Sequence, residues 1–369
     1  MKIINRSRLR EIDFLRGIAI LLVLLRHQEL FKFTTEMGWI GVDLFFVLSG
    51  FLVSGLLFKE YLKFGDIKPY LFLFRRGFKI YPIYYISVLV YVSALILKKN
   101  IDLVNLFSEL FFIQNYTKGY GYINPVSWSL AVEEHFYILL VFLLWISLKK
   151  KWIFLKVDHQ SLKLGKIEFS IFGLMLICLL LRFLYNDNFY ISNKSFTMTH
   201  LRIDSLFAGV LISYLYYFKQ AILVCLMRFK YMLLIIVFIG VFWTAFTPSN
   251  ISYFTVTIGF SLIFTSFGLL LIYFLMEKNV NQQLNRIFTK AIVNIVARIG
   301  YCSYSIYLFH FFVIQNSMKL IENYIPYYNH RLNFLITATL SVVVGIFLTN
   351  TIEKYFLIKR DEKFPSRSE

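Results

Sequence analysis

The stretch Phe14–His27, FLRGIAILLVLLRH, is apolar enough for a membrane helix, yet it carries Arg16 near its start and His27 at its end. A cation near the centre of a bilayer helix costs about 2.5–3.5 kcal/mol on insertion scales. A polar group at that depth is a functional candidate by default. The stretch therefore predicts a membrane-spanning helix whose two polar residues need a chemical explanation.

The composition places the whole chain in the same class. Of 369 residues, 58% are hydrophobic, 19% are aromatic and only 16% are charged, which is far outside the range of soluble domains. The formal charge of +18 does not indicate nucleic-acid binding, because the cations lie between apolar runs rather than in a polar domain. We expect an integral protein of the lipid bilayer without a nucleic-acid partner.

The cysteines Cys178, Cys225 and Cys302 lie far apart in apolar surroundings, which gives neither a disulfide framework nor metal-ligand spacing. The scattered histidines also lack such spacing, so no metal is expected. The basic N-terminal flank is similar to that of a signal peptide, but the apolar run contains Asp13 and no small-residue cleavage site follows it. We interpret this segment as a retained first span.

Ten apolar runs are long enough to cross the hydrocarbon core, which takes about 20 helical residues. With the N-terminus in the cytoplasm, inside segments hold 28 of the 39 Lys and Arg residues, and outside segments hold 8. This asymmetry predicts an all-α bundle of about ten transmembrane helices with both termini cytoplasmic. The runs cover residues 12–30, 39–58, 80–97, 130–148, 167–185, 203–218, 230–247, 254–276, 299–317 and 332–351.

The connections leave no room for a soluble domain. The longest, 98–129, holds about 32 residues, and its apolar part 103–113 is short enough to be re-entrant or interfacial. No internal repeat of the transporter kind is evident. We expect one transmembrane domain over residues 1–369, with its core at about 12–353 and no fused soluble domain.

Arg16 and His27 are eleven residues apart, which on a helix is three turns plus about 20° and about 16 Å along the axis. They therefore share one face, with Arg16 toward the cytoplasmic side and His27 toward the outer side. Asp13, one turn before Arg16, is placed to pair with it. The alternative is an Asp–Arg pair that only fixes helix packing, together with an interfacial histidine.

In GWIGVDLFFVLSGFLVSG, residues 38–55, Asp43 lies at about the depth of His27 and is placed to orient its imidazole. Small residues of the same run let helices approach closely. We interpret these small residues as packing positions: Gly41, Ser49, Gly50, Ser54 and Gly55.

PVSWSLAVEEHFY, residues 125–137, contains Trp128, expected at an interface, and the adjacent carboxylates Glu133 and Glu134. Adjacent helical residues point about 100° apart, so at most one glutamate is expected near His27, and the other should hold a neighbouring helix. Three polar residues from later segments join this outer group: Arg202 and Asp204 in LRIDSLFAG, and His310 in IGYCSYSIYLFH. A single intramembrane histidine is more often a packing group than a catalyst.

FRRGFKIYP, residues 74–82, places Arg75, Arg76 and Lys79 at the cytoplasmic start of the third span. Arg75 or Arg76 together with Lys79 fits one helix face and suits a phosphate-bearing ligand. Anchoring to anionic lipid is the alternative. This basic inner group and the outer histidines and carboxylates fit an enzyme that takes a phosphorylated donor from the cytoplasm and serves an acceptor at the other face.

Six segments in this order resemble the membrane-bound acyltransferase 3 family, the bacterial O-acyltransferases that modify surface polysaccharides and similar acceptors. The resemblance covers the chain from Asp13 to about Glu353. It implies a ten- or eleven-helix bundle in the bacterial cytoplasmic membrane that uses acetyl-CoA or another acyl-CoA as cytoplasmic donor. The segments are DFLRGIAILLVLLRH, GVDLFFVLSGFL, RRGFKIYP, PVSWSLAVEEHFY, RIDSLFAG and YSIYLFH.

The resemblance also implies residue roles. The Arg-x10-His motif of the family falls on Arg16 and His27, with His27 the catalytic candidate. Its Arg-Arg-x-x-Arg motif falls on Arg75, Arg76 and position 79, as donor contacts. Lys79 keeps the charge of that last arginine but loses its forked geometry.

Residues and resemblance together predict a mechanism. His27, oriented by Asp43 or by a glutamate of the fourth helix, would take a proton from an acceptor hydroxyl that attacks the thioester carbonyl. Arg16 would neutralise Asp13 and organise the donor path, or assist the oxyanion. A covalent acyl-histidine is equally open, because sequence does not distinguish a base from a nucleophile.

The expected acceptor is a hydroxyl of a cell-surface glycan or a lipid-linked sugar, acylated directly. The alternative class is a multi-pass transporter or flippase in which the buried His, Arg and Asp residues form a relay. Dependence on acyl-CoA rather than on an ion gradient would distinguish the enzyme from the transporter.

Overall fold

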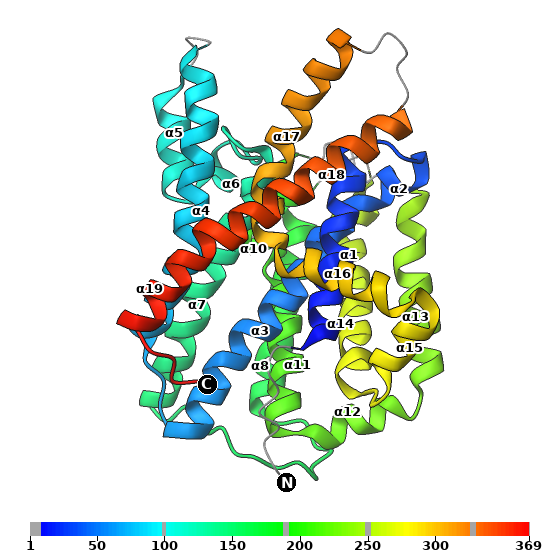
Figure 1. Cartoon of the computed structure of the whole chain (residues 1–369). Helices are drawn as coiled ribbons and strands as arrows, with labels where there is room; N and C mark the ends of the chain where they lie inside the picture. The colour runs from blue at the N-terminus through cyan, green and yellow to red at the C-terminus, as the bar shows by residue number, and fades with distance from the viewer. Residues whose placement is uncertain (1–8, 98–100, 187–191, 248–251, 325–329, 369) are drawn as a thin grey trace.

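The computed structural model of the chain describes residues 9–97, 101–186, 192–247, 252–324 and 330–368 (Figure 1). Every regular element within these ranges is helical, and the ranges contain no β-strand. The expected all-α architecture is therefore confirmed for the described part of the chain.

Each of the ten apolar runs overlaps at least one helix. Among the described residues, five helical segments are long and apolar enough to cross a membrane, and up to seven if each of two bent helix pairs is one span. The membrane character is thus confirmed, whereas the number of ten spans stays a prediction. The helices are α1 (Arg10–His27), α3 (Gly41–Phe64), α4 (Pro69–Leu97), α7 (Trp128–Lys149), α8 (Lys166–Tyr185), α11 (Asp204–Phe218), α13 (Lys230–Phe242), α14 (Phe260–Met276), α17 (Ser303–Tyr324) and α18 (His330–Leu348).

Shorter helices connect these elements. The run 103–113 forms the short helix α5, which exposes Leu103 and Val104 as an interfacial segment would. The short elements are α2 (Lys32–Met37), η1 (Gly38–Ile40), α5 (Leu103–Leu110), α6 (Gln114–Thr117), η2 (Pro125–Ser127), α9 (Lys194–Thr197), α10 (Thr199–Arg202), α12 (Gln220–Met227), η3 (Trp243–Ala245), η4 (Thr255–Gly259), α15 (Val280–Phe288), α16 (Lys290–Tyr301), η5 (Thr349–Glu353) and α19 (Lys354–Lys363).

A tight turn joins α3 to α4. Gly65 ends α3 with a φ of 71°, in the left-handed region that favours glycine, and its N–H donates to the carbonyl of Tyr61 at 2.7 Å. Helix α4 then begins at Pro69, whose fixed φ suits a first helical position. The turn keeps the end of α3 beside the start of α4, where the C-terminal end of the chain also lies (Figure 1).

A close crossing of α1 and α16 positions the start of α17. A Cβ atom on Gly300 would lie 1.8 Å from the carbonyl oxygen of Asp13, so only glycine permits this approach. Helices α16 and α17 are bent by 79° at their junction. The predicted ninth span, 299–317, therefore begins too early, because its first residues belong to α16 and α17 begins at Ser303.

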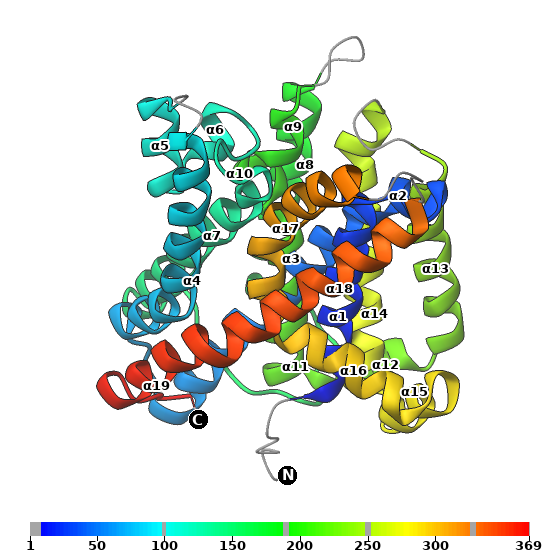
Figure 2. The ribbon, with the colours of Figure 1, turned by 45° about the horizontal axis from the view of Figure 1, so that its top comes forward.

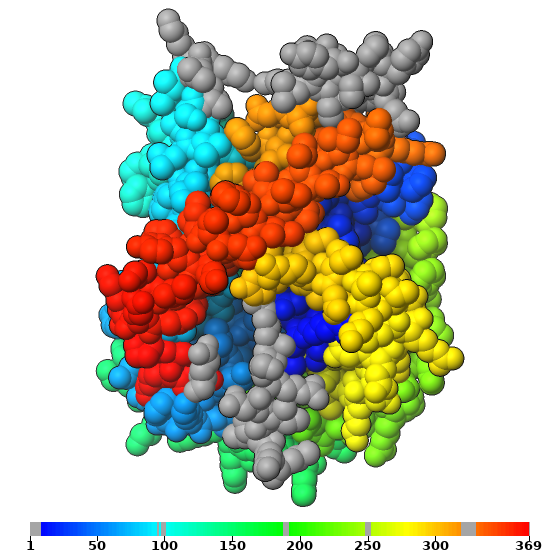
Figure 3. Space-filling model, viewed as in Figure 1, coloured from blue at the N-terminus to red at the C-terminus, as the bar shows by residue number. Residues whose placement is uncertain are grey.

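Helices α1, α3 and α14 lie in the interior of the bundle, and α18 with α19 forms a long band across its outside (Figures 1, 2 and 3). The interior is filled by apolar side chains such as Phe46 and Phe136, which are fully buried. Large apolar side chains on the outer helices, such as Leu184 and Phe238, are exposed. This distribution suits a bundle whose outer surface contacts lipid.

Candidate active site

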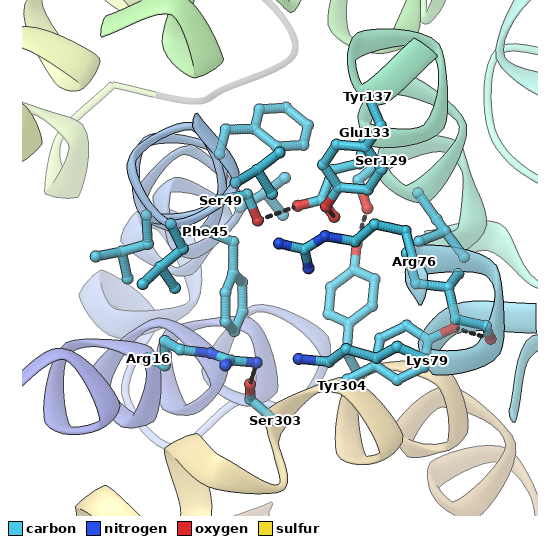
Figure 4. A pocket seen from close by; sticks show the side chains of 18 of the residues that line it. Arg16, Phe45, Ser49, Arg76, Lys79, Ser129, Glu133, Tyr137, Ser303 and Tyr304 are labelled. Atoms are coloured by element: carbon cyan, nitrogen blue, oxygen red, sulfur yellow. Dashed lines mark hydrogen bonds between the residues drawn. The ribbon is translucent and has the colours of Figure 1, made fainter. Parts of the chain in front are cut away.

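A cavity of about 110 Å³ lies among α1, α3, α4, α7 and α17 (Figure 4). Its polar lining includes Arg16, Ser49, Arg76, Lys79 and Glu133. Small-molecule pockets usually measure about 300–1,000 Å³. The cavity is therefore large enough for a small chemical group but too small for a nucleotide.

Arg16 of α1 reaches the cavity where α17 begins. One Nη of its guanidinium donates to Ser303 Oγ at 2.9 Å, and the side chain points into the cavity (Figure 4). The close crossing of α1 and α16 at Gly300 brings the start of α17, directly after α16, to this part of α1. Asp13 is buried one turn earlier on α1, and its pairing with Arg16 stays a prediction.

The two adjacent glutamates of α7 face different neighbours. Glu133 lines the cavity and accepts hydrogen bonds from Ser49 Oγ and from the Tyr137 hydroxyl, both at 2.7 Å. Glu134 accepts from the Tyr81 hydroxyl of α4 at 3.0 Å. The expectation that one glutamate holds a neighbouring helix agrees with this geometry, but Glu133 lies with the basic residues of the cavity rather than with His27.

The basic side chains of the α4 motif also point in two directions. Arg76 and Lys79 line the cavity, and the Arg76 guanidinium lies 5.5 Å from the Tyr137 ring. Arg75 instead forms an ion pair of 3.0 Å with Asp361 of α19. Of the two arginines that could share a helix face with Lys79, the structure thus places Arg76 there.

His27 of α1 lies against His310 of α17. Their ring centroids are 5.1 Å apart, with the planes inclined by 47°. His310 Nδ1 lies 2.7 Å from the carbonyl oxygen of Tyr307. A carbonyl oxygen only accepts hydrogen bonds, so Nδ1 carries the hydrogen and Nε2 of the neutral ring keeps its lone pair. The sequence favoured a packing role for His310, whereas the structure puts it beside the catalytic candidate.

Helix α17 connects the cavity with this histidine pair. Ser303, Tyr304 and Tyr307 line the cavity, and His310 follows one turn later. His310 is fully buried, and its Nε2 has no hydrogen-bond partner within the described part of the chain. The sequence signal was present but not used: in YSIYLFH, Tyr307 lies three residues after Tyr304 and three before His310, so it neighbours both on the helix surface.

Asp43, the predicted partner of His27, pairs with a different residue. Asp43 forms a buried ion pair with Arg202, with 2.7 Å between Oδ1 and Nη2. Across the residues that the structure describes, no hydrogen bond joins the His27 ring to Asp43, Glu133 or Glu134. The prediction that one of these carboxylates orients His27 is wrong, because each of them is bound to a different helix or side chain.

Asp43 and Arg202 belong to a larger group, which we name the ion-pair cluster: Asp43, Arg182, Arg202 and Asp204. Arg182 and Asp204 form its second pair, also at 2.7 Å. The Arg202 guanidinium lies 3.6 Å from the Phe260 ring and 5.7 Å from the Trp128 ring. Trp128 is only 8% exposed and packs against this cluster, whereas its expected depth at the membrane interface stays a prediction.

Comparisons with known proteins agree with the motifs. The chain is 32% identical to a Staphylococcus aureus (strain COL) protein provisionally named an O-acetyltransferase, over 56% of this chain and 34% of that protein. It is 32% identical to the peptidoglycan O-acetyltransferase OatA of Listeria monocytogenes, over 39% of this chain and 26% of that protein. It is 24% identical to the O-acetyltransferase OatA of S. aureus (strain MRSA252), over 96% of this chain and 59% of that protein.

The matched segments thus span from about a quarter to somewhat over half of the length of these curated relatives. No solved structure matches the chain. A family model described as an acyltransferase domain matches residues 9–350, which is nearly the whole chain. On the extent of that match, the chain belongs to the acyltransferase 3 family.

Proposed function

We propose that the chain is a membrane O-acyltransferase that moves an acyl group, acetyl being the first candidate, from acyl-CoA to a hydroxyl of a cell-surface or lipid-linked glycan. The observation that carries the proposal is the arrangement along α17, where a charged cavity adjoins the His27–His310 pair. Membership of the acyltransferase 3 family supports acyl transfer. The relatives named as O-acetyltransferases support acetyl as the group and oxygen as its acceptor.

The topology that suits this function has ten spans in the bacterial cytoplasmic membrane and both termini in the cytoplasm. The distribution of 28 Lys and Arg residues on one side and 8 on the other supports it. Arg76 and Lys79 then lie toward the cytoplasm, and the His27 end of α1 lies toward the outside. The donor enters from the first side, and the acceptor approaches from the second.

Three cations, Arg16, Arg76 and Lys79, converge on the cavity and form the proposed donor path. A volume of about 110 Å³ suits the acyl end of a thioester. The nucleotide of acyl-CoA exceeds that volume, so it stays at the cytoplasmic mouth while the thioester reaches inward. Arginine and lysine suit the phosphates and the developing negative charge of such a donor.

In the proposed reaction, His27 takes the proton of the acceptor hydroxyl as the oxygen attacks the thioester carbonyl. Arg16 is eleven residues from His27 on α1, about 16 Å along the helix axis, so it organises the donor path rather than the reacting carbonyl. The carbon–sulfur bond then breaks, the proton passes from His27 to the thiolate, and an ester and free CoA result. His310, held by the Tyr307 carbonyl, supports the His27 ring. A route through an acyl-His27 intermediate uses the same residues.

The test is transfer of radiolabelled acetyl from acetyl-CoA to surface glycan in membranes that contain the wild-type chain or His27→Ala at equal protein level. Loss of a general base lowers such a rate by about 10²–10⁴-fold. His135→Ala is the control, because His135 lies on α7 outside the cavity lining and contacts Thr199. We expect labelled glycan with wild type and His135→Ala, and almost none with His27→Ala.

Two other outcomes would change the assignment. Equal labelling by wild type and His27→Ala would make His27 a packing residue and move the chemistry to Glu133 and Arg16. No labelling by wild type, combined with substrate movement driven by an ion gradient, would favour the transporter class instead.

A further inference from the structure

The C-terminal helix brings charged residues to the start of α4. Arg75 and Arg76 are adjacent on α4 and so point about 100° apart. Arg76 lines the cavity, whereas Arg75 contacts α19, with 3.0 Å between its Nη2 and Asp361 Oδ1. Arg75 Nη1 also donates to the carbonyl oxygen of Phe364. Arg75, a predicted donor contact, is therefore engaged by the end of the chain.

Asp361 lies between two arginines. Arg360 Nη2 lies 2.8 Å from Asp361 Oδ1, and Arg360 Nε donates to the same oxygen at 2.9 Å. The Asp361 carboxylate thus accepts from Arg75 of α4 and Arg360 of α19 together. Two converging guanidinium groups are a typical site for a phosphate group.

The segment after α19 is fastened to the same corner of the bundle. The Phe364 ring stacks on Phe74 of α4 with centroids 5.4 Å apart and planes 2° from parallel. Arg367 forms ion pairs with Glu60 at 2.9 Å and with Asp66 at 2.8 Å, at the end of α3. The end of the chain therefore lies across the turn between α3 and α4 (Figures 1 and 2).

We propose that Arg75 and Arg360 form an anion site for a phosphate group of the acyl donor, and that the Asp361 carboxylate occupies this site until the donor displaces it. The inference rests on the proposed function, since it names where the nucleotide end of that donor is held. The cavity has about 110 Å³, so the phosphates must bind outside it, and the two arginines lie beside its Arg76 wall.

Displacement of Asp361 is favourable on physical grounds. The Asp361 side chain is 53% exposed, while those of Arg75 and Arg360 are 14% and 18% exposed. A carboxylate this exposed regains hydration when it leaves, and exposed ion pairs contribute little free energy. A phosphate group carries more charge and more acceptor oxygens than a carboxylate, so it binds the same pair of arginines more strongly.

Two matched pairs of variants test the proposal on the purified full chain in nanodiscs of phosphatidylcholine. Arg360→Gln removes one side of the anion site, and Lys359→Gln removes the same charge from the same helix. Asp361→Asn removes the occupying carboxylate, and Glu362→Gln removes its neighbour. Lys359 and Glu362 are good controls because they pair with each other at 2.9 Å on the exposed face of α19.

The measurement is the dissociation constant for CoA. Arg360→Gln should weaken binding about tenfold, as expected for one charge-assisted hydrogen bond. Asp361→Asn should tighten binding, because the binding-competent state no longer competes with an internal carboxylate. This gain cannot arise from misfolding. Both controls should bind as wild type does. Equal binding by Arg360→Gln and Lys359→Gln, or weaker binding by Asp361→Asn, would overturn the proposal.

A second arm separates the donor from an anionic lipid headgroup, which offers the same phosphate chemistry. The titrations are repeated in nanodiscs that contain phosphatidylglycerol. An effect of Arg360→Gln on CoA binding in both lipids supports the donor site. If Arg360→Gln leaves the dissociation constant for CoA unchanged and lowers only the affinity for phosphatidylglycerol, the site belongs to lipid and the proposal is overturned. If the wild-type chain binds no CoA in either lipid, the proposed function itself fails; if all variants bind CoA alike, only the anion site fails.

Discussion

Two pairs of arginines inside this bundle have opposite surroundings. Arg182 and Arg202 are fully buried, and each lies 2.7 Å from a carboxylate in the ion-pair cluster. Arg16 and Arg76 instead line a cavity, Arg16 with a hydrogen bond to Ser303 and Arg76 beside the Tyr137 ring. Protein atoms surround the guanidinium groups of the first pair, whereas the guanidinium groups of the second pair face the cavity.

The difference separates a structural use of buried charge from a functional one. In a buried ion pair a close carboxylate already matches the charge, and breaking the pair is costly because a charge remains without its partner. A cation that faces a cavity can meet the charge of a bound molecule. The two groups should therefore respond to substitution in different measurements, stability for the ion-pair cluster and catalysis for the cavity.

The largest effect is expected for Arg202→Gln. The substitution leaves the buried Asp43 carboxylate without its ion-pair partner, and such a loss costs about 3–5 kcal/mol of unfolding free energy. The measurement is thermal or chemical unfolding of the purified chain in detergent, together with acetyl transfer per folded molecule. We expect much lower stability and near-normal transfer by the molecules that remain folded. Full stability with lost transfer would instead put Arg202 in the active site.

Arg16→Gln should instead lower the rate of acetyl transfer and leave most of the stability. Removing a cation from the proposed donor path misplaces the thioester, and a misplacement of about 1 Å lowers the rate by about 10²-fold. The cost in stability should be smaller than for Arg202→Gln, because the cavity leaves room for water in place of the guanidinium. Arg26→Gln is the matched control, since Arg26 is on the same helix, donates to the Thr35 carbonyl at 3.2 Å and does not line the cavity. An Arg16 variant that unfolds but retains kcat would make Arg16 a packing residue.

The spacing within one helix predicted that Lys79 shares a face with Arg75 or Arg76, and Arg76 and Lys79 do line the cavity together. The sequence placed Arg16 on a face with His27 and did not indicate that it joins these two cations. It failed for Asp43, because depth in the membrane does not say which neighbouring helix a side chain faces. Asp43 and His27 were expected at one depth, yet Asp43 turns toward Arg202. A partner from another helix cannot be read from the spacing within one motif.

The same limit explains two other misses. The bend after Tyr301 lies in an apolar run without a proline, so the sequence showed one span where α16 and α17 meet at 79°. The contact of Arg75 with Asp361 joins residues nearly three hundred positions apart in the chain. Such long-range contacts follow from how the helices pack, which hydrophobic runs and charge counts do not specify.

A double substitution tests whether the ion-pair cluster is purely structural. Asp43→Leu with Arg202→Met removes both charges, and apolar replacement of a buried pair is often neutral or stabilising by about 1–4 kcal/mol. We expect the double variant to recover stability relative to Arg202→Gln in the same unfolding assay, with transfer retained. A double variant that is stable but inactive would show that the cluster contributes to catalysis as well as to packing.

The smallest effect concerns Glu109, a third kind of buried carboxyl, in the connection between the third and fourth predicted spans. Glu109 is fully buried and accepts hydrogen bonds from Ser127 Oγ and, at 2.8 Å, from the Tyr122 N–H. In the described part of the chain it forms no ion pair. Unlike Asp43, it therefore has no arginine to offset its burial, and burial raises its pKa from 4.5 to about 7.

The folded chain thus holds this proton more tightly than the unfolded chain does. Its contribution to stability is complete below pH 4.5, and it is lost as the pH rises through about 7, by at most about 1.4 kcal/mol per pH unit. We expect the melting temperature of the wild-type chain to fall over this window and that of Glu109→Gln to fall less. If the melting temperatures of the two chains fall equally with pH, Glu109 is already ionised in the folded chain. Its hydrogen bonds would then stabilise its carboxylate, as Arg202 stabilises that of Asp43.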